Sequence, residues 1–260
     1  MGLTQNQVKN IENILTNSLR DKFKNYKPET SSMPFHTRLL GKDRLALYSF
    51  IHSLSTNFGT TIFEPVAVAM AKDNFKTARS HVSAGDHIST GAQIEIQKIM
   101  DSLVTASSSP DKKKEIETIR KVSKSGNIVK VKPTLVDLFL EDKNGIIYLF
   151  DIKTAKPNVG NFKEFKRTLL EWVAVTVTSN PLSNVNTLIA IPYNPYEPAR
   201  YNRWTMRGMF DMNNELKVAK EFWDFLGGND AYQDLLNCFE RVGIKMRSEI
   251  DSYFSNFNKF

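Results

Sequence analysis

The stretch KPTLVDLFLEDKNGIIYLFDIKTAKP, residues 132–157, decides the fold of this chain. It predicts two β-strands, residues 134–141 and 146–153, joined by a turn that contains Asn-Gly, the strongest short hairpin signal. The second strand is almost continuously apolar, which is typical of a strand buried in the middle of a sheet.

Three ionisable residues, Asp137, Asp151 and Lys153, interrupt this apolar hairpin. Because side chains alternate along a strand, Asp151 and Lys153 point to the same face. Burying a carboxylate or an ammonium group is costly unless the group is paired or binds a metal ion. Two carboxylates and a lysine at a strand end therefore predict a divalent-cation site, with Asp137 and Asp151 as ligands and Lys153 beside them.

The order Asp137, then Asp151-Ile152-Lys153, resembles the PD-(D/E)XK nuclease motif, although Pro133 is not adjacent to Asp137. The alternative is an edge strand with a surface Asp–Lys pair. The position of both acids on adjacent apolar strands favours the motif.

The family usually places a further acid on a helix before the catalytic sheet, and Glu95, within a helix expected over residues 91–103, is the candidate. A solvated helix-face glutamate is the alternative for Glu95.

Length and composition limit the possible domain organisation and partners of the chain. The chain has 260 residues, enough for one elaborated domain, and a formal net charge of +7, which favours a polyanionic partner such as nucleic acid. The single cysteine, Cys238, excludes an intrachain disulfide and fits a cytoplasmic protein. Cys238 lies among apolar residues and is expected in the core. No apolar run approaches the length of a membrane span.

The remaining pattern predicts helices over residues 4–26, 43–58 and 162–178, and strands over 127–131 and 186–191. A strand–helix–strand unit makes its two strands parallel, so the hairpin and this unit together give a mixed sheet. The predicted fold is α/β: a restriction-endonuclease-like mixed β-sheet flanked by helices, with helical N- and C-terminal elaborations. We divide the single domain into a helical scaffold (1–75), a catalytic core (91–192) and a DNA-contact loop with a helical tail (193–260).

Several basic residues are candidates for DNA contact. Lys163 and Lys166, at the start of the helix after the hairpin, are expected to hold the DNA backbone. The loop that follows the last strand presents Arg200, Arg203 and Arg207 among aromatic residues, a composition that suits base and phosphate contact. The alternative is that Tyr201 and Trp204 are core residues and the arginines form structural ion pairs.

Two further segments are polar. Residues 78–90 form an expected loop in which His81 and His87 either contact phosphate or are solvated. Residues 106–124 predict a mobile surface insertion that carries a triple lysine.

The run PYNPYEPARYNRWTMRGMF (192–210), the block EFWDFLGG (221–228) and the DIK hairpin together resemble the TdeIII family of type II restriction endonucleases. The resemblance implies Mg²⁺-dependent cleavage of double-stranded DNA at a short, partly palindromic site, of the GGNCC type. It assigns catalysis to Asp137, Asp151, Lys153 and Glu95, and pairs the enzyme functionally with a cognate DNA methyltransferase. Cutting both strands of a palindrome calls for a homodimer. Two other classes stay open: a repair or junction-resolving nuclease with the same motif, and a non-catalytic DNA-binding module.

Overall fold

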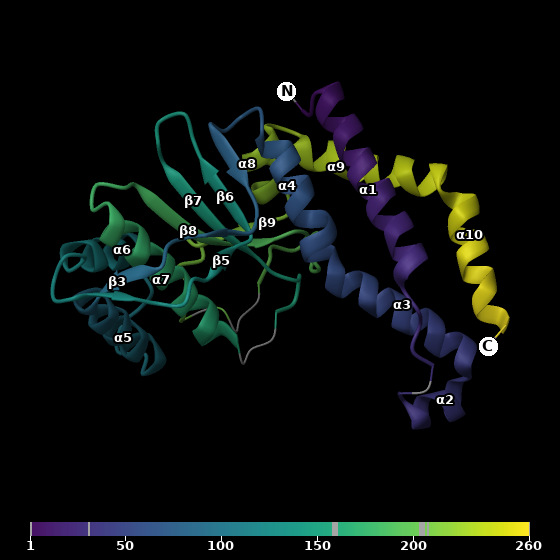
Figure 1. The fold of residues 1–260 in the computed structure, drawn as a ribbon, viewed down its shortest axis with the longest axis horizontal. Helices are drawn as coiled ribbons and strands as arrows, with labels where there is room; N and C mark the ends of the chain where they lie inside the picture. Colours follow the sequence, from purple (N-terminus) through teal and green to yellow (C-terminus); the bar gives the residue numbers. More distant parts are fainter. Residues whose placement is uncertain (1, 31, 158–160, 203–205, 207, 260) are drawn as a thin grey trace.

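A five-stranded mixed sheet lies at the centre of the computed structural model, which describes residues 2–30, 32–157, 161–202, 206 and 208–259. Its strand order is β1-β6-β7-β8-β9 (Figure 1). The strands are β1 (Thr77–Arg79), β6 (Leu138–Glu141), β7 (Ile147–Ile152), β8 (Val185–Ile191) and β9 (Leu216–Val218). The β1, β6 and β7 strands are antiparallel, whereas β8 and β9 continue the sheet in parallel with β7. The predicted mixed α/β fold is confirmed.

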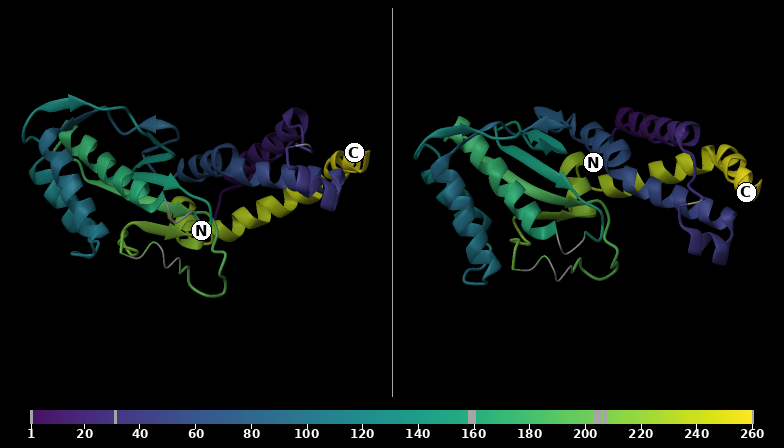
Figure 2. Two further views of the ribbon diagram at one scale, coloured as in Figure 1. Left: turned by 90° about the horizontal axis from the view of Figure 1, so that it is seen from below. Right: turned by 60° about the horizontal axis from the view of Figure 1, so that its bottom comes forward.

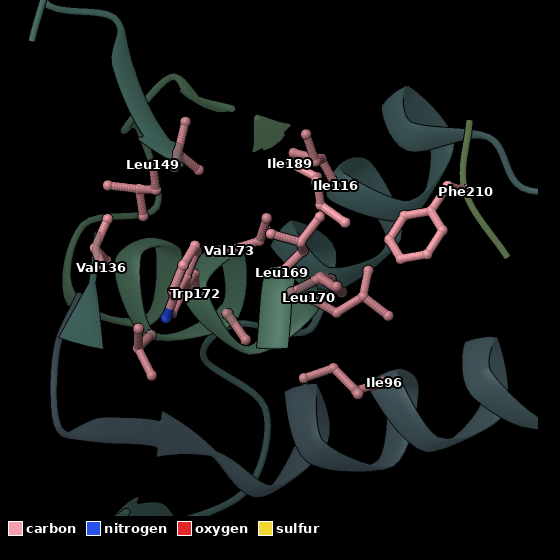
Figure 3. Packing of buried hydrophobic residues seen from close by; sticks show 14 of the residues in the cluster. Ile96, Ile116, Val136, Leu149, Leu169, Leu170, Trp172, Val173, Ile189 and Phe210 are labelled. Carbon is pink, nitrogen blue, oxygen red and sulfur yellow. The ribbon is translucent and has the colours of Figure 1, made fainter. Parts of the chain in front are cut away.

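Helices cover both faces of the sheet because its strands are apolar on both sides. Leu149 and Ile189 face a core shared with α5 (Thr90–Val104), α6 (Lys112–Lys121) and α7 (Phe162–Ser179), part of which Figure 3 shows. Phe150 and Leu188 face the opposite core, shared with α1 (Gln5–Asn25), α4 (Glu64–Ala71), α8 (Lys220–Gly227) and α9 (Ala231–Lys245). Cys238 is fully buried in this second core, as expected.

A helical arm extends from one side of this body (Figures 1 and 2). It contains α1, α2 (Pro34–Leu40), α3 (Lys42–Phe58) and α10 (Arg247–Ser255). Thr4 caps α1, since its hydroxyl accepts the N–H of Gln7 at 3.3 Å. A small aromatic core around Phe50, Tyr253 and Phe257 holds the arm together. One π-helical turn, η1 (Gly59–Phe63), joins α3 to α4.

The hairpin forms as predicted in β6 and β7, where Leu138 pairs with Phe150. Gly145 has φ 79°, a left-handed conformation that glycine adopts without strain. The first strand, expected over residues 134–141, is shorter because the chain leaves the ladder at Asp137. Before that residue, β5 (Leu135–Val136) pairs with β2 (Val82–Ser83) and not with the central sheet.

Two polar segments are more ordered than their composition predicts. Residues 106–124 contain α6, so the predicted mobile insertion is wrong for this stretch. Asp111 caps the helix by accepting the N–H of Lys114, and Ile116 and Ile119 pack into the core. Residues 78–90 contain β2, β3 (His87–Ser89) and the end of β1, in place of a continuous loop. The β3 strand pairs with β4 (Ile128–Lys130).

Candidate active site

The hairpin brings Asp137, Asp151 and Lys153 together at one end of β7. Asp151 is the penultimate residue of the strand and only 6% exposed. Its neighbour Ile152 donates its backbone N–H to Oδ2 of Asp137 at 2.8 Å, which fixes the second carboxylate beside the first. Lys153 Nζ lies 2.6 Å from Oδ1 of Asp151. Two carboxylates and one ammonium group therefore converge where the sheet ends.

An aromatic ring also contacts Lys153. The lysine Nζ lies 4.5 Å from the ring centroid of Phe165, in the first turn of α7, close enough for a cation–π interaction. The lysine side chain remains 26% exposed. Its ammonium group is thus held between a carboxylate and a ring, and keeps access to solvent.

Glu64 is a third acidic residue at this site, and sequence reasoning missed it. It begins α4, is 2% exposed, and its Oε2 accepts no hydrogen bond from the described residues. The Nε2 atom of His81 lies 2.9 Å from Oε2, although without the alignment of a hydrogen bond. The charge of Glu64 also raises the pKa of Asp137. A lone acid in the apolar run of residues 62–71 was the signal that could have identified it.

Burial controls the protonation of all three carboxyl groups. It raises the pKa of Asp151 to about 6 and that of Glu64 to about 7. It also raises the pKa of Asp137, to which the charge of Glu64 adds, while the N–H of Ile152 acts in the opposite direction. Lys153 stabilises the charged form of Asp151. Carboxylates in this situation gain most from a nearby cation, because the cation offsets both burial and mutual repulsion.

The donor set fits a hard divalent cation. Within the described part of the chain, His, Cys, Asp and Glu side chains do not gather in threes at a spacing that could hold a metal ion. Mg²⁺ is commonly bound by one or two carboxylates and completes its shell with water and substrate oxygens. Asp137 and Asp151 supply such a pair.

The protein without metal should lose stability as pH rises. In the folded state Asp151 and Glu64 keep their protons up to about pH 6 and 7, whereas their ordinary pKa values are 3.8 and 4.5. Between about pH 4 and 7 the unfolded chain binds fewer protons than the folded one, so the free energy of unfolding falls. We expect a Tm under chelation that is about 5 °C lower at pH 8 than at pH 5. A Glu64→Gln/Asp151→Asn double variant should show a smaller difference, and an equal difference would contradict the assignment.

Glu95 is not among the groups whose charges most affect the pKa of Asp137 or Asp151. It lies on α5, which covers the opposite face of the sheet from α4 (Figure 1). Its carboxylate is 3.8 Å from Lys98 on the same helix, a spacing of one helical turn. The largest charge effects on Asp137 come from Glu64 and Lys153. Glu64 is therefore a second candidate, beside Glu95, for the helix-borne acid.

The expectation that Lys166 holds the DNA backbone is wrong for this structure, because Lys166 is completely buried. Its Nζ donates to Glu115 and to Glu215, each at 2.6 Å. Lys112 reaches the other oxygen of Glu215 at 2.9 Å. Two lysines and two glutamates thus neutralise one another inside the protein, and none of them is available to a phosphate. Lys163 is exposed, as expected.

Removing one member of this buried network should destabilise the protein strongly. Lys166→Met leaves two buried carboxylates without their shared partner, so we expect a loss of about 3–5 kcal/mol in the free energy of unfolding. Lys163→Met, three residues earlier and exposed, should change it by less than about 0.5 kcal/mol. Urea unfolding of both variants measures the difference. Similar stability of the two would show that the network does not form.

The loop after β8 lies against the strand end that carries the site. The hydroxyl of Tyr201 donates to the carbonyl of Ala155 at 3.2 Å, and the Tyr201 ring packs on the core shared with α7. Tyr201 therefore packs on the core, which was the alternative to DNA contact for this residue. Arg200 is exposed. Arg203, Trp204 and Arg207 lie outside the described residues.

Among the described residues, no helix combines the length and the hydrophobicity that a bilayer span requires.

Comparison with known proteins identifies the family of this chain. A family model described as type II restriction endonuclease, HinfI, matches residues 3–243. The chain is 28% identical to the type II restriction enzyme HgiEI of Herpetosiphon aurantiacus over 222 residues, covering 84% of this chain and 79% of that protein. It is 24% identical to MjaII of Methanocaldococcus jannaschii, covering 100% of this chain and 77% of that protein. HgiCII of Herpetosiphon aurantiacus is 26% identical, covering 84% and 80%.

These matches confirm the class predicted from the sequence, a DNA-cleaving hydrolase, although the narrower TdeIII assignment is not confirmed. With 241 of 260 residues inside the family model, the chain belongs to the HinfI family of type II restriction endonucleases.

Proposed function

We propose that this chain is a cytoplasmic type II site-specific deoxyribonuclease of the PD-(D/E)XK type, and that it hydrolyses duplex DNA with Mg²⁺. The observation that carries the proposal is the convergence of Asp137, Asp151 and Lys153 at the end of β7. The buried, unpaired state of Cys238 is in keeping with a reducing compartment.

Asp137 and Asp151 would hold the metal ion. When bound there, Mg²⁺ supplies Lewis-acid polarisation of a phosphoryl oxygen and lowers the pKa of water. Lys153 would neutralise charge that develops on the phosphate, because its ammonium group is partly exposed beside the carboxylates. Glu64 would orient water at the same place through Oε2, which accepts no hydrogen bond from the described residues. Phe165 holds the Lys153 side chain in position.

The substrate in this proposal is double-stranded DNA with a short, partly palindromic site. The TdeIII resemblance implies a GGNCC-type sequence, and a twofold-symmetric site calls for a homodimer. A cognate DNA methyltransferase would protect the host sites without necessarily binding this chain.

Incubation of the purified protein with phage DNA and Mg²⁺ tests this function directly. We expect discrete fragments whose ends map to one short sequence, and intact DNA when Mg²⁺ is chelated. A smear, or cleavage restricted to branched substrates, would indicate a repair or junction-resolving nuclease. Metal-independent binding with no cleavage would indicate a DNA-binding module.

Arg200 and Lys163 should differ in how they contribute to DNA binding. If Arg200 contacts a base edge, Arg200→Ala should cost about 1–3 kcal/mol and relax preference at one base pair. Lys163→Ala, on the exposed start of α7, should weaken binding to all duplexes alike and reduce the salt slope by about one unit. Binding of cognate and single-substituted duplexes across a salt series separates the two. Equal losses on both kinds of duplex for Arg200→Ala would make it a phosphate contact.

A further inference from the structure

The tip of the helical arm exposes more apolar surface than is usual for a monomeric protein. Phe35 and Leu39, one helical turn apart on α2, are 83% and 82% exposed. On α3, Leu47, Tyr48 and Ile51 are 45%, 54% and 47% exposed. We call the following set the α2–α3 apolar surface: Met33, Phe35, Leu39, Leu40, Leu47, Tyr48 and Ile51.

Both helices lack cover on this side. None of the seven residues of α2 is buried, although three of them are large and apolar. A helix this short is unstable in water unless something packs on its apolar face. The opposite side of α3 already packs into the arm through Ala46 and Phe50. A helix that is apolar on both sides is typical of one that is covered on both sides.

We propose that a second copy of this chain covers the α2–α3 apolar surface in a twofold-symmetric dimer. With about 200 Å² for a fully exposed large side chain, the exposed fractions of the seven residues amount to roughly 800 Å². This is about the area that each partner contributes to a standard stable interface, roughly 800 Å². A single monomer seldom exposes an apolar patch above about 600 Å².

The shape of the arm fits this arrangement. A groove runs between α3 and the segment before α2, next to the exposed residues. Met33, Leu45 and Tyr48 line it together with polar side chains such as Glu29, Ser49 and His52, and it can receive a partner side chain. The surface lies at the end of the arm, away from the strand end that carries Asp137 and Asp151 (Figures 1 and 2). Covering it would leave the candidate active site open. The choice of a second copy as the partner rests on the proposed function, because a twofold DNA site needs two nuclease centres.

Sedimentation velocity of the full chain, without DNA or metal, tests the proposal. We expect a concentration-dependent dimer for the wild-type protein. The Phe35→Ser/Leu39→Ser variant should raise the dimer dissociation constant roughly 100-fold, since truncation of buried apolar contacts in an interface centre has large effects. Ile51→Arg probes the same surface from α3. The matched control is Leu182→Ser, because Leu182 is 91% exposed in the turn after α7, outside the arm.

A wild-type protein that stays monomeric, or variants that dimerise as the wild type does, would overturn the proposal. If the substituted chains do not fold, hydrogen exchange of the wild-type protein decides. Residues 33–51 should become protected as protein concentration rises, and unchanged exchange would overturn the proposal. A dimer that never cuts DNA would remove only the proposed function, whereas a monomer that cuts would remove only this inference.

Discussion

Replacing Asp151 by asparagine should lower the rate of DNA cleavage by about 10³-fold or more, and leave binding of duplex DNA largely intact. The carboxylate is one of two oxygen donors that would hold Mg²⁺, and loss of metal catalysis is worth several kcal/mol of transition-state stabilisation. Asparagine keeps the size of the side chain and can still accept the 2.6 Å contact from Lys153. The fold should therefore survive.

Single-turnover cleavage and duplex binding under chelation measure the two expected effects separately. Asp142→Asn is the matched control: it makes the same substitution in the same hairpin, at the turn, where Oδ1 of Asp142 accepts the N–H groups of Asn144 and Ile146. An amide oxygen can accept both bonds, so this variant should cut normally. Near-normal cutting by Asp151→Asn would remove the site assignment.

Glu64→Gln should reduce cleavage by about 10²–10³-fold, the loss typical of removing one positioned group from an active site. Glu95→Gln should cut almost as fast as the wild type. The contrast is expected because Glu64 is buried and acts on Asp137, whereas Glu95 pairs loosely with Lys98, one turn along the same helix. The same substitution at two helix-borne glutamates makes each variant the control of the other. If Glu95→Gln is the defective one, the acid predicted from the sequence is correct and Glu64 is structural.

The Glu64 variant should also be more stable than the wild type when metal is absent. Burial raises the pKa of Glu64 to about 7, so above that pH the folded protein carries a charge that burial disfavours. Glutamine removes this charge. A higher Tm together with lower activity would show that the residue is retained for chemistry and not for folding.

The local parts of the fold could be predicted from the sequence. The hairpin has its own turn signal, and α7 and β8 follow it with clear periodicities, so the parallel pair β7–β8 was accessible. The separation of β5 from β6 could not be predicted from the sequence. It depends on the pairing of β5 with the distant strand β2, and on the Asp137 carboxylate, which accepts the N–H of Ile152 in place of a strand-to-strand hydrogen bond.

The site could be predicted only in part, for a similar reason. Asp137, Asp151 and Lys153 are close in sequence, and alternation places two of them on one face. Glu64 lies much earlier in the chain, on α4, and sequence spacing does not show that its charge would act on Asp137. The prediction that Lys166 contacts DNA was wrong because it rested on the charge of the side chain and not on its position along the helix. Lys166 follows Phe162 by four residues and precedes Leu169 and Leu170, so it falls on the buried stripe of α7.

The buried network of Lys112, Glu115, Lys166 and Glu215 constrains how this protein can evolve. Loss of Lys166 leaves Glu115 in the interior without its partner, at a cost of about 3–5 kcal/mol, a large share of the stability of an ordinary domain. During evolution, a lysine and a glutamate of this network would therefore have to be substituted together for the protein to remain folded. Glu215 directly precedes β9, and the segment that carries Arg200 ends at this residue. The exposed positions of the arginine segment can change independently, whereas Glu215 at its end is tied to Lys112, Glu115 and Lys166.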